Sequence, residues 1–333
     1  MKTGLFAVAL FLCVGSTPAQ TIKWYKFDKT FIQSQYGKDG SAIGVLKVSA
    51  MHPAKSVHSI SCGGNDGELH IGIAESELIP LAGHRPASAF AEDSDSGFGV
   101  VAGPPNVKRG SLFTKIEDAD GEPAAFYGYF RVWNEGHDVG AVHPSNPHHV
   151  LEVHPIWGIK SKDLDYAPNP AVISSMSRYS GYGASKFRPL LASIPQWLRV
   201  AEDENFVYVQ LAKAENFYQL PVRVKQVRGF GEGAGVAALV DVYSDTAHQN
   251  RVYQNLTVVS AADSPTAKQL KPGWSTYLLG FFSINLSKAM GIAVGHEGQS
   301  GAVPAPGALE FFAFGVPHQN AVSKSTPCTE EHD

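Results

Sequence analysis

The chain of 333 residues is poor in cysteine, in charge and in catalytic signature motifs. It contains 3 cysteines, and charged residues make up only 17 % of it. The sequence contains no G-x-S-x-G elbow, phosphate-binding loop or dinucleotide-binding glycine fingerprint. The absence of these motifs excludes a typical α/β-hydrolase, a P-loop enzyme and a Rossmann dehydrogenase. The apolar run at residues 5–14 is too short to span a bilayer, no other stretch is longer and as apolar, and we expect no membrane span.

The chain is also short of positive charge. Lys and Arg number 27 against 31 Asp and Glu, which gives a net charge of −4 with His neutral. Proteins held on nucleic acid by their overall charge are usually basic, so the bulk charge does not favour such a partner. A local basic groove remains compatible with this balance. The sequence does not identify the ligand, and nucleic acid and carbohydrate are both candidates.

Residues 1–19 have the pattern of a signal peptide. Lys2 gives a positive start, residues 5–14 form an apolar run, and residues 17–19 supply the small side chains of a cleavage site. We therefore expect the mature chain to begin at Gln20 and to be secreted or periplasmic.

Export would leave two cysteines in the mature chain, Cys62 and Cys328. Two cysteines in an exported protein often form a disulfide. The alternative is a buried Cys62 and a free cysteine in the tail, and the sequence separation gives no geometric test between the two.

Composition and periodicity predict a mainly β protein. Glycine (33) and proline (21) are frequent, which favours turns and short strands, and few segments have a helical period. We predict an OB-like small β-barrel at residues 20–165, followed by a second β-rich domain, a sandwich or a barrel, at residues 191–320. A stretch rich in Ser, Tyr, Gly and Pro predicts a linker or long loop at 166–190, and 321–333 is expected to be a polar tail.

Histidine is concentrated in one segment: five of the 13 histidines fall between His137 and His154. At its end, Glu152 and His154 stand at alternate positions, the period of a half-buried strand. Their side chains would share one face, with Leu151 and Val153 on the other. A carboxylate beside an imidazole can transfer a proton or bind a divalent metal.

An earlier segment repeats this pattern: Glu68 and His70 alternate with apolar residues, and Asp66 stands at the preceding turn. Two strands of one small sheet would bring both pairs together. The candidate catalytic residues are then Glu152, His154 and His70. The candidate ligands of a divalent metal, zinc or manganese, are Asp66, Glu68, His70, His137, Glu152 and His154. The alternatives are acid–base catalysis without metal and a solvated polar face whose histidines are hydrogen-bonded across the sheet.

A third cluster lies in the predicted strand AAFYGYFRVW. Its period places four side chains on one face as candidate ligand-binding residues: Tyr127, Tyr129, Arg131 and Trp133. Aromatic side chains with an arginine can stack bases or sugar rings on small barrels. The alternative is an aromatic face packed against the second domain or a loop, because aromatic residues bury large areas.

Two motifs in the first predicted domain resemble those of a known family. DGELH at residues 66–70 resembles a D-G-D-x-H strand. AFYGYFRVWNEGH followed by LEVHPI resembles a strand-G-x-x-x-x-D-x-x-H segment that ends in E-[IL]-H-P-[VI]. Residues 40–160 thus resemble a family of small exported or uncharacterised bacterial proteins with an OB-like barrel. The resemblance implies that fold and a site at Asp66, Glu68, His70, His137, Glu152, His154 and Pro155.

The leading hypothesis is a secreted binding protein that holds its ligand on the polar, histidine-bearing face of an OB-like domain. One alternative is a metal-dependent hydrolase, for example of phosphodiesters, with Glu152 as base and the histidines as metal ligands or acids. The other is a structural envelope protein with incidental histidines. The sequence leaves open whether the protein is an enzyme.

Overall fold

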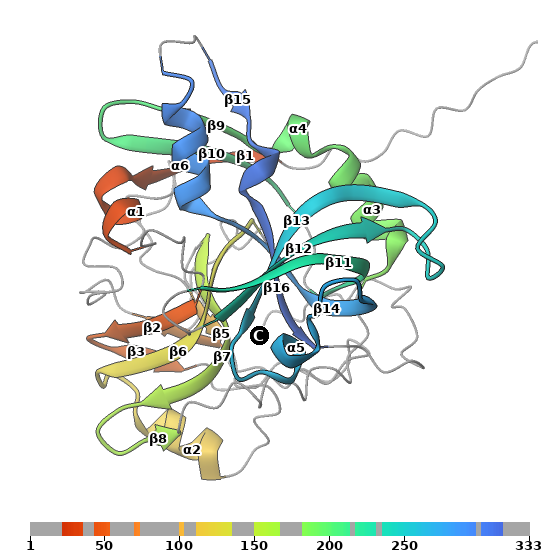
Figure 1. The fold of residues 1–333 in the computed structure, drawn as a ribbon. Coiled ribbons are helices and arrows are strands. Elements are labelled where there is room, and N and C mark those ends of the chain that lie inside the picture. Colours follow the sequence, from red (N-terminus) through yellow and green to blue (C-terminus); the bar gives the residue numbers. More distant parts are fainter. Residues whose placement is uncertain are drawn as a thin grey trace, which may run out of the picture.

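In a computed structural model, the strands of the described residues form three β-sheets that share one core (Figure 1). One is an open four-stranded sheet, one a seven-stranded sheet and one a closed five-stranded barrel. The predicted mainly β class is therefore confirmed. The structure describes residues 22–35, 43–53, 70–73, 100–102, 111–134, 150–166, 182–213, 217–230, 235–297 and 301–315.

The four-stranded sheet, in the order β1-β10-β9-β15, joins the start of the described chain to its middle. All of β1 pairs antiparallel with β10, from Ile22 opposite Ala212 to Asp28 opposite Phe206. This ladder links a strand of the predicted first domain to one of the predicted second, and the domain boundaries stay a prediction. The strands are β1 (Ile22–Asp28), β9 (Arg199–Glu202), β10 (Phe206–Ala212) and β15 (Val303–Pro304).

Apart from β1, the strands of residues 20–165, where the sequence predicts a barrel, belong to the seven-stranded sheet. Its order is β2-β6-β7-β5-β4-β3, with β8 paired to β7, and in the described residues it is open. Strands β6 and β7 are central, and the barrel covers one of their faces. The strands are β2 (Ile43–Val48), β3 (Met51–Pro53), β4 (His70–Ile73), β5 (Val100–Ala102), β6 (Ala124–Val132), β7 (Leu151–Lys160) and β8 (Asp165–Tyr166).

The closed barrel lies in the C-terminal part of the chain. Its order is β11-β12-β13-β16-β14, and β13 and β16 form its one parallel pair, an arrangement consistent with an OB-like barrel. Apolar side chains such as Val222, Val240 and Leu256 are buried, so a barrel of this size is packed rather than hollow. Its strands are β11 (Tyr218–Phe230), β12 (Gly235–Tyr243), β13 (Arg251–Ala261), β14 (Ser275–Ile284) and β16 (Leu309–Gly315).

Among the helices, α6 connects two sheets. It starts after Asn285, whose Oδ1 accepts from the backbone N of Lys288 at 2.9 Å, and it packs against β9, β10 and α1 (Figure 1). No helix in the described residues is long and apolar enough to cross a membrane. The helices are α1 (Lys29–Gln35), α2 (Ser111–Asp118), α3 (Ala184–Ala192), α4 (Ile194–Trp197), α5 (Pro265–Gln269), α6 (Leu286–Val294) and the 3₁₀ turn η5 (Pro306–Ala308).

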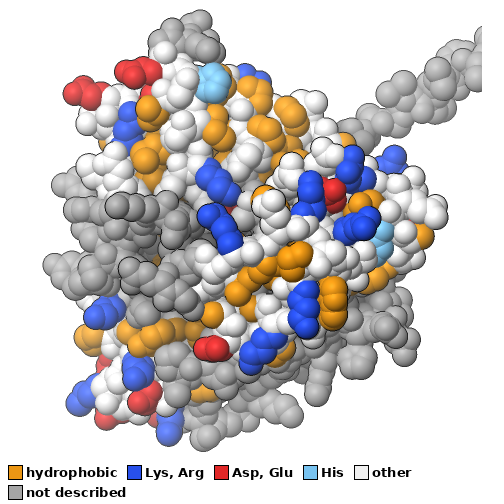
Figure 2. Space-filling model, viewed as in Figure 1, with side chains coloured by type: hydrophobic (Ala, Val, Ile, Leu, Met, Phe, Trp, Pro, Cys, Tyr) orange, Lys and Arg blue, Asp and Glu red, His pale blue; other side chains and the backbone are white. Residues whose placement is uncertain are grey.

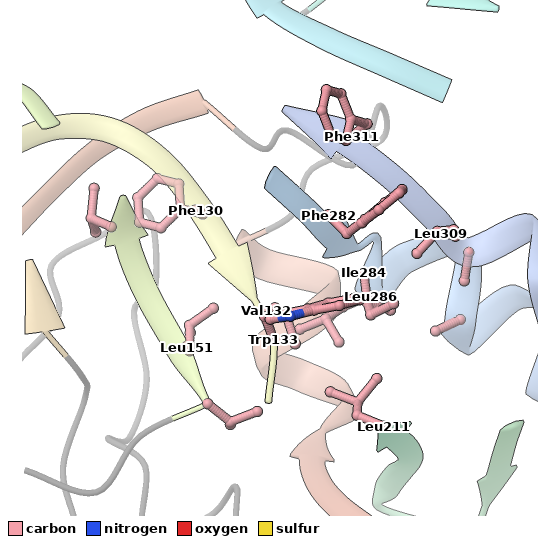
Figure 3. Close-up of a cluster of buried hydrophobic side chains, with 14 of the residues drawn as sticks. Phe130, Val132, Trp133, Leu151, Leu211, Phe282, Ile284, Leu286, Leu309 and Phe311 are labelled. Atoms are coloured by element: carbon pink, nitrogen blue, oxygen red, sulfur yellow. The ribbon is translucent and has the colours of Figure 1, made fainter. Parts of the chain in front are cut away.

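A single hydrophobic cluster connects all three sheets. Figure 3 shows side chains of β6, β7, β10, β14 and β16 meeting near the start of α6. At the centre, the ring of Trp133 stacks on Phe282 with centroids 6.0 Å apart and meets Trp197 edge-on at 5.9 Å. Because these contacts join sheet to barrel, separating the two would expose large aromatic surfaces to water.

The close approach of β14 and β16 gives a test of the barrel. A Cβ on Gly280 would collide with the carbonyl oxygen of Phe312 and would lie 2.7 Å from the ring of Phe311. Gly280→Ala must force the strands apart and should lower the free energy of unfolding by about 2–3 kcal/mol, measured by urea denaturation. The control is Gly291→Ala in α6, where a Cβ meets nothing within 4 Å. That change should be neutral or stabilise by up to about 1 kcal/mol, and equal losses in both variants would contradict the close approach of β14 and β16 at Gly280.

Candidate functional site

Glu152 and His154 lie side by side on one face of β7. The Nδ1 atom of His154 is 3.4 Å from Oε1 of Glu152. Arg131 of β6 stands directly opposite Glu152 in the register, and its Nη1 donates to the same oxygen at 2.7 Å. The two-residue alternation predicts the first contact. The second joins Glu152 to a residue that the sequence assigns to the aromatic cluster.

This polar cluster is buried. The exposed fractions of Arg131, Glu152 and His154 are 0, 4 and 2 %. Alternation predicts a half-buried strand, but the first nine of the ten residues of β7 are buried. The reason is that β14 covers the face: Nε of Arg131 donates to the carbonyl oxygen of Phe282 at 3.1 Å. The cluster therefore lies between the seven-stranded sheet and the barrel.

Aromatic rings of the barrel side close over the cluster. The ring of Phe281 lies 4.4 Å from the His154 ring and 4.4 Å from Cζ of Arg131. Phe217 packs against Phe281 at 4.8 Å. A guanidinium over an aromatic face gains a cation–π attraction that strengthens when water is excluded. Such surroundings suit a buried structural ion pair.

The predicted aromatic cluster also meets the barrel. The hydroxyl of Tyr129 accepts from the backbone N of Ala261 at 2.7 Å, and its ring stacks on Phe312 at 5.1 Å. Burial raises the pKa of Tyr129 to about 12. Trp133 is buried as described above, and Tyr127 is partly buried. For Tyr129 and Trp133 the structure shows the packing alternative, with the C-terminal strands as the partner.

The other predicted site residues are placed only in part. His70 stands beside Ala102 of β5, and Val101 stands beside Val153 of β7. His70 and His154 are thus in line across β5, two strand spacings or about 10 Å apart. Asp66, Glu68 and His137 lie outside the described residues.

A metal centre remains a prediction. Within the described ranges, no group of three or more His, Cys, Asp or Glu side chains is arranged to hold a metal ion. Glu152 and His154 are the two predicted ligands that the structure brings together, and half of the predicted zinc or manganese set, Asp66, Glu68 and His137, is outside the described residues.

The outer face of the barrel carries cations that the sequence analysis missed. Arg223 of β11 stands opposite Asp241 of β12. Nζ of Lys225 lies 3.6 Å from Oδ1 of Asp241, and Nη1 of Arg251 lies 3.2 Å from Oδ2. The three cationic residues are exposed, and Figure 2 shows Lys and Arg side chains gathered over these barrel strands. One carboxylate cannot neutralise three cations, so this surface has an excess of positive charge.

Trp274 lies at the edge of this surface with 45 % of its area exposed. Its carbonyl oxygen accepts from the backbone N of Val224 at 2.7 Å, and the next residue, Ser275, pairs with Arg223. Nζ of Lys271 lies 5.5 Å from the indole centroid. We call Arg223, Lys225, Asp241, Arg251, Lys271 and Trp274 the basic face. Its sequence signal is VRVKQVR, in which cations alternate with valines.

A pocket of about 560 Å³ between α1, β9 and the end of α6 has the opposite charge. Its carboxylates are partly engaged, because Lys29 pairs with Glu202, and Tyr208 donates to Asp203 at 2.6 Å. That hydrogen bond from Tyr208 is the main reason why the pKa of Asp203 is lowered. The charged and titratable side chains that line the pocket are Lys29, Glu202, Asp203, Glu204, His296 and Glu297.

Comparison of the chain with family models, with curated proteins and with solved structures found no match. The resemblance noted in the sequence therefore stays a prediction beyond the presence of a small five-stranded barrel. A barrel of this kind supports many activities, so a function has to be inferred from particular side chains.

The buried cluster predicts a large cost for removing one charge. Glu152→Gln keeps the shape of the side chain but leaves the Arg131 guanidinium without its carboxylate. We expect the free energy of unfolding to fall by about 3 kcal/mol in urea denaturation. The control is Asp165→Asn, which breaks an exposed ion pair of 3.8 Å with Lys160 and should change stability by less than about 0.5 kcal/mol. A loss as small as the control's would show that the cluster contributes little to stability.

Proposed function

We propose that the chain is an exported binding protein and that its ligand is an anionic oligomer held on the basic face of the barrel. The observation that carries this proposal is the group of exposed cations around Asp241, with an exposed indole, Trp274, at its edge. The proposal keeps the binding class predicted from sequence and moves the ligand from the histidine-bearing face to the barrel.

Charge supports this choice of ligand. The whole chain has a net charge of −4, so its positive potential is local to surfaces such as the basic face. Arg223 and Arg251 carry planar guanidinium groups, which pair in bidentate fashion with phosphate, sulfate or carboxylate. Such a positive patch attracts anions, even though the chain as a whole is negatively charged.

The indole supports a ligand that contains rings. An exposed tryptophan beside cations can stack on a nucleobase or a sugar ring while the cations hold the acidic groups. In OB-type barrels the face of the second and third strands binds oligonucleotides and oligosaccharides. Here these strands are β12 and β13, which carry Asp241 and Arg251. The likeness to OB-type barrels is one of fold alone, and the charges of the basic face carry the proposal.

The buried cluster explains why the ligand is not assigned to β7. A ligand could reach Glu152 or His154 only if the seven-stranded sheet and the barrel came apart. The metal-dependent hydrolase and the structural envelope protein stay alternatives, and no contact among the described residues favours either of them over binding.

The test is binding of two labelled probes, an oligothymidylate and an oligogalacturonate, to the mature chain by fluorescence anisotropy at low salt. Arg223→Glu reverses a charge in the basic face and should lower the affinity for the probe about tenfold or more. The affinity of this variant should also depend less on salt concentration than that of the parent. Trp274→Ala should weaken it about five- to tenfold through lost stacking. Each variant should keep the melting temperature of the parent, because both side chains are exposed.

The matched control is Lys162→Glu, which reverses an exposed charge in the turn after β7. It should bind as the parent does. The proposal is wrong if neither probe binds the parent chain, or if Lys162→Glu weakens binding as much as Arg223→Glu. Preference for one probe over the other identifies the class of oligomer.

A further inference from the structure

Glu310, the second residue of β16, is a buried carboxyl that belongs to neither surface described above. It is 1 % exposed, and the register places it between Thr257 of β13 and Ser283 of β14. Its Oε2 accepts from Nδ2 of Asn285 at 3.1 Å. Its Oε1 has no hydrogen-bond partner among the described residues. A buried oxygen without a donor tolerates a neutral carboxyl far better than a carboxylate.

Asn285 connects this carboxyl to helix α6. The same amide that donates to Glu310 caps the helix, since its Oδ1 accepts from the backbone N of Lys288 at 2.9 Å. The side chain of Lys288 reaches back to the barrel, where Nζ donates to Oγ1 of Thr257 at 2.9 Å. Glu310, Asn285 and Lys288 therefore join β16, the start of α6 and β13 in one polar contact.

The pKa of the Glu310 carboxyl lies near neutral pH. Burial raises the pKa of Glu310 from 4.5 to about 7, against the opposing effects of Lys288 and Asn285. Burial also lowers the pKa of Lys288; Glu310 opposes this shift, and Arg228 of β11 adds to it. The neighbours on β13 and β14 are the hydroxyl groups of Thr257 and Ser283. Lys288 is thus the charged group of the described residues that bears on this carboxyl.

Helix α6 connects the Glu310 carboxyl to the four-stranded sheet. It buries Leu286, Ala289 and Ala293, and it packs against β9 and β10 of the four-stranded sheet and against α1 (Figure 1). The contact between Glu310 and Asn285 is therefore also a contact between the barrel and the element that covers this sheet.

We propose that the buried carboxyl of Glu310 is a proton-controlled latch, which lets α6 stay on the barrel while it is neutral and loosens α6 when it ionises. The Asn285 amide and the Lys288 cation favour the carboxylate, but the cost of burying a charge whose Oε1 has no donor among the described residues outweighs both. A carboxylate here needs water at Oε1, and water reaches it when α6 moves away from β16. Because the pKa in the closed state lies above the ordinary value, the closed state binds the proton more tightly than the open one. Its advantage is complete below about pH 4.5 and is lost as the pH rises to about 7. The latch does not depend on the ligand proposed above.

The test is hydrogen–deuterium exchange of the full mature chain, with rates corrected for the intrinsic effect of pH. From about pH 5.5 to about pH 8, protection of the α6 amides should fall roughly 30-fold relative to the amides of β12, as the shift of Glu310 implies. Glu310→Gln cannot ionise and should reduce this change to less than about twofold. The control is Glu297→Gln, an exposed carboxyl just beyond α6, which should behave as the parent.

A second variant keeps the test decisive if Glu310→Gln does not fold. Lys288→Met removes the cation that favours the carboxylate, so α6 should stay protected to a higher pH than in the parent. Equal protection of α6 at both pH values in the parent would overturn the latch, because ionisation of Glu310 would then leave the helix closed. A full pH response in Glu310→Gln would overturn it as well.

Discussion

The arrangement of the sheet and the barrel depends on the Arg131 guanidinium. It bonds to Glu152 within its own sheet and to the carbonyl oxygen of Phe282 in the barrel. The apolar contacts around it stabilise the interface but are not directional, and many relative positions would bury a similar area. A buried charge is satisfied in few of these positions. The ion pair therefore favours one register of the interface, and in that register Trp133 and Tyr129 also pack against the barrel.

The alternation of residues 150–154 predicts which side chains share a face of β7 but does not predict what packs over that face. It places Glu152 and His154 on one face because the direction of a side chain in a strand depends only on its position. Whether that face meets water depends on what packs over it, and here the cover is β14. Arg131 and Phe282 are 151 residues apart in the sequence, so no local pattern reports their contact. The same reason explains why an aromatic face offered for ligands is filled by protein.

The barrel illustrates a similar limit. Its strand character follows from the alternation of segments such as VRVKQVR, and a mainly β fold is predictable from composition. Its closure depends on the parallel pairing of β13 with β16, which comes only after α5, β14 and α6. The basic face likewise exists only once the barrel closes, because Arg223, Asp241 and Trp274 come from three separate segments. Motif spacing alone could not bring these three residues together.

The ladder between β1 and β10 sets the order in which the chain can mature. Ribosomes release the N-terminal strand first, yet its hydrogen-bonding partner ends at Ala212. Until that residue has emerged, β1 presents an unpaired edge that carries Tyr25 and Phe27, two aromatic side chains which the finished fold buries. The pairing of β1 with β10 joins segments that are distant in sequence, and such contacts form more slowly than local ones. Until then, these two aromatic side chains lack the cover that the folded sheet gives them.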